Sequence, residues 1–82
     1  MKPFNIIRQI DVFDKASEAL IEEIYLDSFD LELMKSRFDI LPDDPLMYYQ
    51  YEIDPTKTDL FPFIKFDFNK NLYVIATYQE SK

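Results

Sequence analysis

Two adjacent carboxylates and a group of tyrosines are the side chains of this sequence that could do chemistry. Asp43 and Asp44 lie between two prolines, and residues 46–53, which follow, carry three tyrosines. Paired carboxylates can bind a cation or transfer a proton, whereas tyrosines can stack on bases or anchor a protein interface. The flanking prolines predict that both aspartates lie in an exposed loop that ends a preceding helix.

The chain lacks the residues on which most catalytic and metal sites depend. It contains no His, no Cys and no Gly. The commonest general base, a thiolate zinc site and a glycine-rich phosphate loop are therefore excluded. The spacing of a calcium loop is also missing around the two aspartates. We expect no enzymatic activity, no cofactor and no metal site, and we expect Asn or Asp wherever a turn needs positive φ.

The acidic side chains are concentrated in the middle of the chain. Net charge is −7 over 82 residues, and residues 11–54 hold 13 acids and 3 bases, whereas the flanks hold 3 acids and 6 bases. This distribution opposes contact with nucleic acid or an anionic membrane, and it favours a basic protein partner or simply solubility. Because no apolar run approaches the ~20 residues of a membrane span and no signal peptide is recognisable, we expect a soluble cytoplasmic protein.

The first third of the chain predicts a strand followed by an ambiguous segment. Residues 4–13 alternate between apolar and polar side chains, with Arg8 interrupting the apolar face. Residues 18–26 fit either a helix or a second strand. We favour the strand narrowly, because a hairpin that pairs the apolar residues also sets Arg8 opposite Glu23.

The rest of the chain predicts two short helices and further strands. Asp30 is a favourable N-cap for a helix over residues 31–38, and Asp54 followed by proline begins a shorter one. Strands are expected at residues 46–53, 63–68 and 72–78, with the last in the centre of the sheet. The predicted fold is therefore α+β: a single domain of residues 1–82, with an antiparallel sheet of about four to five strands and one or two short helices packed on one face.

Several short motifs, taken in order, give the sequence a family resemblance. They are Phe13-Asp14-Lys15, Asp30-Leu31-Glu32-Leu33-Met34, Asp43-Asp44-Pro45-Leu46-Met47-Tyr48, Tyr51-Glu52-Ile53 and Phe66-Asp67-Phe68. In this outline the chain resembles small, acidic, uncharacterised bacterial proteins that are similar to the immunity proteins of polymorphic or contact-dependent growth-inhibition toxins. The resemblance implies a protein that binds a toxic domain, often a nuclease, in the cytosol of the producing cell and blocks its active site.

The charge pattern indicates which residues would contact such a partner. Acidic side chains complement the basic surface of a nuclease, and tyrosines beside them supply anchors. The predicted partner-binding residues are Asp39, Asp43, Asp44, Tyr48, Glu52 and Asp54, with Glu22 and Glu23 as an extension. The alternative is a scaffold or regulatory domain that pairs residues 46–53, as an exposed edge strand, with another chain or with itself. The oligomeric state stays open.

Overall fold

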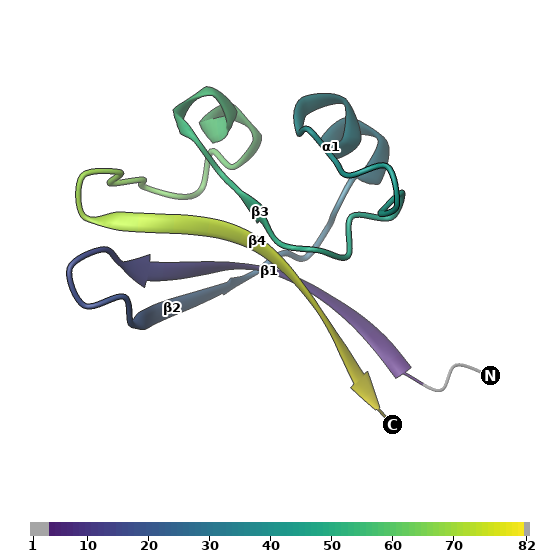
Figure 1. Cartoon of the computed structure of the whole chain (residues 1–82), viewed down its shortest axis with the longest axis horizontal. Coiled ribbons are helices and arrows are strands. Elements are labelled where there is room, and N and C mark those ends of the chain that lie inside the picture. The colour runs from purple at the N-terminus through teal and green to yellow at the C-terminus, as the bar shows by residue number, and fades with distance from the viewer. Residues whose placement is uncertain (1–3, 82) are drawn as a thin grey trace.

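The structure is a computed structural model that describes residues 4–81. Its elements are β1 (Phe4–Asp14), β2 (Leu20–Tyr25), helix α1 (Leu31–Arg37), β3 (Tyr51–Glu52), the 3-10 helix η1 (Pro55–Leu60) and β4 (Asn71–Ser81). The four strands form one antiparallel sheet in the order β2-β1-β4-β3. Both helices lie on the same side of this sheet (Figure 1). The fold is therefore α+β, as the sequence predicts.

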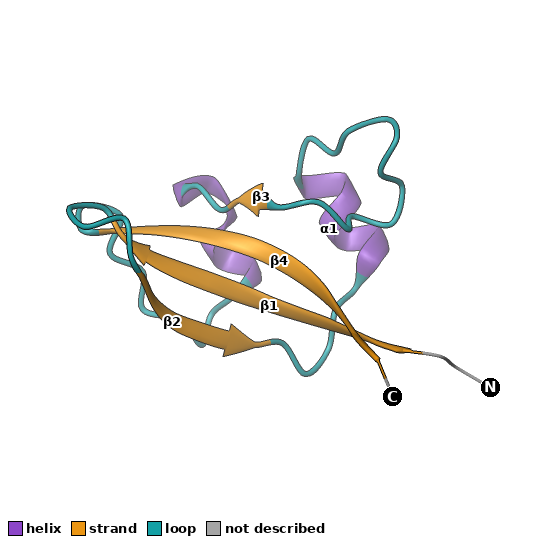
Figure 2. Cartoon of the chain, turned by 60° about the horizontal axis from the view of Figure 1, so that its bottom comes forward, coloured by secondary structure: helices purple, strands orange, loops and turns teal. Residues whose placement is uncertain are grey.

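The sheet is organised around the pairing of its first and last strands. Phe4 lies opposite Ser81 and Asp14 opposite Asn71, so β1 and β4 pair along their whole length. Each also has an outer neighbour, because β2 lies beyond β1 and β3 lies beyond β4 (Figure 2). The prediction of a central C-terminal strand is confirmed, and β4 is longer than the predicted range 72–78.

The core lies between the sheet and the helices. It contains Ile10, Val12, Met34, Phe38, Met47, Tyr51, Ile53, Phe61, Tyr73 and Ile75. Both predicted helix starts are confirmed, since the Asp30 carboxylate accepts the Leu33 N–H at 3.1 Å and the Asp54 carboxylate accepts the Thr56 N–H at 2.9 Å. These capping bonds satisfy N–H groups that have no partner within a helix, so they fix where α1 and η1 begin.

The β1–β2 hairpin confirms the strand interpretation of residues 18–26, but its predicted register is wrong. Glu23 lies opposite Asp11 and not opposite Arg8, and a β-bulge interrupts the pairing near the turn. The Arg8 side chain finds its partners on another segment, described below. The turn itself places Glu18 at a φ of 62°. The expectation that Asn or Asp would supply positive φ is therefore also wrong.

The predicted strand over residues 46–53 is reduced to two residues. Only Tyr51–Glu52 forms a strand with β4, whereas Leu46 lies in a turn and residues 47–50 belong to no helix or strand. Met47 is the reason, because it adopts a φ of 55° and turns the chain while its side chain is fully buried. A residue in the left-handed region cannot continue an extended strand.

The predicted strand over residues 63–68 is absent. The alternating aromatic residues serve another purpose there: Phe66 and Phe68 stack with ring centroids 5.2 Å apart, and both meet Tyr73 edge-on. The Tyr73 hydroxyl also accepts the Asp67 backbone N–H at 2.8 Å. The alternating phenylalanines therefore form an aromatic cluster with Tyr73 of β4 and do not form a further strand.

The sheet face turned away from the helices carries a polar network. Asp11 is only 2% exposed, and its carboxylate accepts hydrogen bonds from the Tyr78 hydroxyl at 2.5 Å and from Gln9 Nε2 at 2.6 Å. Gln9 Nε2 also donates to the Glu23 carboxylate at 3.1 Å. Since these residues come from β1, β2 and β4, the network ties three strands together on this face.

Tyr78 is expected to ionise far above the usual range of a tyrosine. Its hydrogen bond to Asp11, followed by burial, raises the pKa of Tyr78 from 10.0 to about 12. A folded-state pKa above the unfolded value means that the contact stabilises the fold below pH 10 and loses this effect as the pH rises through about 12. The tyrosinate absorbance of the wild type minus that of Tyr78→Phe should show this late midpoint. A midpoint near the ordinary value of about 10 would mean that the contact with Asp11 does not form.

Candidate functional site

Asp44 organises the loop that connects α1 to β3. Its side chain is 4% exposed, and one carboxylate oxygen accepts the Tyr48 N–H at 2.7 Å. The other oxygen accepts the Tyr49 N–H at 2.9 Å and the Tyr51 hydroxyl at 2.6 Å. A carboxylate that bonds several nearby N–H groups fixes the backbone around it. The prediction that Asp44 is exposed is therefore wrong. Its buried carboxylate fixes the backbone of the loop through these hydrogen bonds.

These hydrogen bonds also decide the charge of Asp44. Burial raises its pKa, but the bonds from the Tyr51 hydroxyl and from the N–H groups of Tyr49 and Tyr48, with the charge of Arg8, give a net lowering of the pKa. A folded-state pKa below the unfolded value stabilises the protein above pH ~4, and this stabilisation is lost as the pH falls further. At neutral pH the Asp44 carboxylate that accepts these hydrogen bonds is therefore charged.

Arg8 anchors the same loop to the sheet. Its guanidinium, which extends from β1, donates to the Met47 carbonyl at 2.6 Å and to the Leu46 carbonyl at 2.9 Å. The guanidinium carbon lies 4.3 Å from the centroid of the Phe29 ring and 5.3 Å from that of Tyr48. Sequence reasoning missed this role because it assigned Arg8 to Glu23. The available signal was a single arginine on the apolar face of a strand, where it must find acceptors.

The loop held by Asp44 and Arg8 presents a mixed apolar and acidic surface. We call residues 41–49 the tyrosine loop. Its large exposed side chains, each 41–48% exposed, are Leu41, Leu46, Tyr48 and Tyr49. Asp43 is exposed beside them and accepts the Tyr49 hydroxyl at 3.3 Å. The charge of Asp43 and this hydrogen bond raise the pKa of Tyr49, so its hydroxyl remains a neutral donor at physiological pH.

Three other predicted acids meet in a separate hollow. Asp39, Glu52 and Asp54 line a polar hollow of about 390 Å³ where α1, β3 and η1 come together. The hollow is not uniformly acidic, because Lys57 also lines it and its Nζ lies 3.1 Å from the Asp54 carboxylate. Asp54 is further occupied by capping η1. Asp39 and Glu52 are therefore the exposed acids of this hollow.

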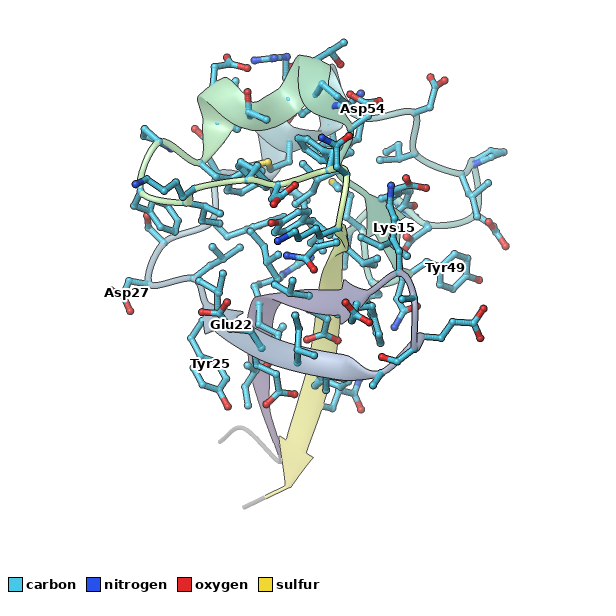
Figure 3. All side chains as sticks on the ribbon, turned by 90° about the vertical axis from the view of Figure 1, so that its left-hand side faces the viewer. Lys15, Glu22, Tyr25, Asp27, Tyr49 and Asp54 are labelled. Atoms are coloured by element: carbon cyan, nitrogen blue, oxygen red, sulfur yellow. The ribbon has the colours of Figure 1, made fainter. Side chains whose placement is uncertain are left out.

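The predicted extension lies elsewhere on the molecule. Glu22 and Glu23 belong to β2, whereas Glu52 belongs to β3, and these strands are at opposite edges of the sheet. Figure 3 shows the separation between the labelled residues Glu22 and Asp54. The predicted partner-binding residues therefore lie in three places: the tyrosine loop, the polar hollow and β2.

Within residues 4–81, no three His, Cys, Asp or Glu side chains are placed together as possible metal ligands. No helix in the same range has the length and apolar character needed to cross a membrane.

Comparison with protein families matches residues 7–76 to the domain of unknown function DUF7683. The chain belongs to the DUF7683 family. The match begins within β1 and ends within β4, so the DUF7683 region includes the tyrosine loop, the polar hollow and β2. Comparisons with curated proteins and with solved structures gave no match.

Proposed function

We propose that this DUF7683 protein is an immunity protein, which binds the toxic domain of a bacterial toxin and blocks its active site. The observation that carries the proposal is the tyrosine loop. Asp44 and Arg8 hold this loop from below, so Tyr48 and Tyr49 are presented in one backbone conformation. A surface ordered before binding loses less conformational entropy when the complex forms.

The chemistry of the loop suits a basic partner with an apolar rim. Tyrosines give a large contact area with few rotatable bonds, and they are enriched among the residues that dominate binding energy. Leu41 and Leu46 add apolar surface, and Asp43 adds a negative charge at its edge. An excess of acids attracts a positively charged active-site surface over a distance, which speeds association. Occupying that surface would exclude the nucleic acid that a nuclease toxin cleaves.

The test measures binding to, and inhibition of, the basic toxin domain that the proposal expects to be encoded beside this protein. Tyr49→Ala is expected to weaken binding about tenfold, because the complex should dissociate faster without this anchor. Asp43→Lys is expected to slow association at low salt, with the difference shrinking as salt screens the charges. Surface plasmon resonance at two salt concentrations measures both rates, and a nuclease assay measures inhibition.

A matched control keeps the overall charge equal. Glu22→Lys changes net charge as much as Asp43→Lys does, but it lies on β2, at the far edge of the sheet. Its effect on the association rate should be clearly smaller. An uninhibited toxin domain would refute the immunity proposal, whereas inhibition unaffected by Tyr49→Ala and Asp43→Lys would remove the tyrosine loop from the interface.

The alternative, a scaffold that pairs an edge strand over residues 46–53, has less support from the fold. Only Tyr51–Glu52 of that range forms a strand paired with β4, and Met47 adopts a positive φ. Edge pairing normally needs several consecutive extended residues, because each pair of residues contributes few hydrogen bonds. The tyrosine loop is therefore the better basis for partner binding in this region.

A further inference from the structure

The longer free edge of the sheet is β2, and no strand within residues 4–81 pairs with its outer side. Its six residues are mostly exposed, including Ile21 at 55% and Tyr25 at 63%. The Leu26 N–H donates to the Arg8 carbonyl of β1 at 3.0 Å. Because backbone groups alternate along an antiparallel strand, the N–H and C=O groups of Glu23 and Tyr25 point away from β1. They are free to pair with an incoming strand.

An apolar groove runs beside this edge. It has a volume of about 470 Å³ and lies between β2, α1 and the segment after η1. Its lining includes the buried core residues Met34 and Phe61, together with the exposed side chains of Leu33 and Phe63, 44% and 64% exposed. An edge with free hydrogen-bonding groups therefore adjoins a groove with unfilled apolar surface.

We propose that β2 and this groove together bind an extended segment of a partner protein in which apolar and basic side chains alternate. The segment adds a strand to the sheet through Glu23 and Tyr25. Side chains of a strand point alternately to the two faces. Those on the helix side enter the groove beside Ile24, and those on the opposite side lie next to the Glu23 carboxylate. Main-chain bonds supply affinity and the groove supplies selectivity.

Charge decides between such a segment and a second copy of the chain. Residues 18–27 contain Glu18, Glu22, Glu23 and Asp27 and no basic residue. Asp27 and Asp30 also line the groove, and Figure 3 shows the labelled Asp27 and Tyr25 on the same side of the molecule. Two β2 strands side by side would bring like charges together, which destabilises strand pairing. Lysine or arginine in the added strand would instead be attracted to these carboxylates.

This inference goes beyond the proposed immunity function and does not depend on it. The surface is separate from the tyrosine loop, and the recognised feature is an extended basic segment, whichever protein supplies it. The β2 edge also selects against other strands, since exposed glutamates and a bulge discourage indiscriminate edge pairing. The bulge lies near the turn, so the Glu23–Tyr25 part remains regular.

The test uses a short synthetic peptide of alternating lysine and valine, with blocked ends, and the full-length protein. Amide hydrogen exchange measured by NMR should show fast exchange at Glu23 and Tyr25 in the free protein. Exchange at both amides should slow at least about tenfold with saturating peptide, because each N–H gains a carbonyl acceptor. A peptide with glutamate in place of lysine should not produce this protection.

Variants separate groove binding from simple charge attraction. Phe63→Ser removes a side chain that is 64% exposed, so it should weaken peptide binding about tenfold and leave the fold intact. Tyr49→Ala, in the tyrosine loop, should leave peptide affinity unchanged. Equal binding of the glutamate peptide, peptide-induced shifts at the tyrosine loop, or no binding of the lysine peptide at millimolar concentration would overturn the proposal. Protection of Glu23 and Tyr25 in concentrated protein alone would assign the edge to a second copy and also overturn it.

Discussion

Replacing Asp44 with alanine is expected to lower the free energy of unfolding by about 3 kcal/mol. The change removes the acceptor of the Tyr51 hydroxyl and of the Tyr48 and Tyr49 N–H groups. Tyr51 is only 8% exposed, so water cannot easily replace the lost partner. Urea denaturation at neutral pH, followed by circular dichroism, measures the loss.

The neighbouring residue supplies the matched control for this prediction. Asp43→Ala removes the same chemical group from an exposed position, so its cost should stay within about 0.5 kcal/mol. The pH dependence adds a second readout, because wild-type stability should fall as the pH drops below ~4 and the fall should be shallower in Asp44→Ala. Equal costs for the two substitutions would show that Asp44 does not organise the loop.

Replacing Arg8 with methionine is expected to cost about 2 kcal/mol. Methionine keeps much of the apolar stem but removes the donors to the Leu46 and Met47 carbonyls and the cation above Phe29. The tyrosine loop would then be held by Asp44 and by the Thr77 hydroxyl, which donates to the Met47 carbonyl at 3.3 Å. Urea denaturation measures the cost, and faster hydrogen exchange at Tyr48 and Tyr49 would report the loosened loop.

Two further substitutions test whether the geometry of Arg8 matters. Arg8→Lys should recover only part of the loss, because one ammonium cannot replace a planar group that reaches two carbonyls and stacks on a ring. Arg37→Met should be milder than Arg8→Met, since the ion pair of Arg37 with Asp59 lies on the surface. Full recovery by lysine would contradict the stacked, two-carbonyl contact.

The parts of the fold that the sequence predicts correctly depend on local signals. Asp30 and Asp54 mark helix starts because the side chain of an N-cap bonds to N–H groups two or three residues away. The last strand is apolar and β-branched, which is typical of a central strand. The strand over residues 20–25 is also predicted, although the register of its hairpin with β1 is not. Each of these signals is contained in the segment that it describes.

The parts that the sequence misses depend on contacts between distant segments. Asp43 and Asp44 are identical in type and adjacent, yet only Asp44 is buried, because Tyr51 and Arg8 meet at that position from β3 and β1. Arg8 lies 38 and 39 residues from the two carbonyls it binds, so the local pattern pointed to the wrong partner. For the same reason the sequence did not show that the predicted partner-binding residues lie in separate parts of the fold.

The full-length pairing of β1 with β4 has a consequence for how the protein is made. During synthesis β1 leaves the ribosome before its partner over residues 71–81 is translated, and within residues 4–81 β3 likewise pairs with β4 alone. Until then the nascent chain exposes the apolar face of β1, and the sheet cannot close. The fold therefore forms after translation of β4, and a message truncated before that strand yields a chain exposed to aggregation and proteolysis.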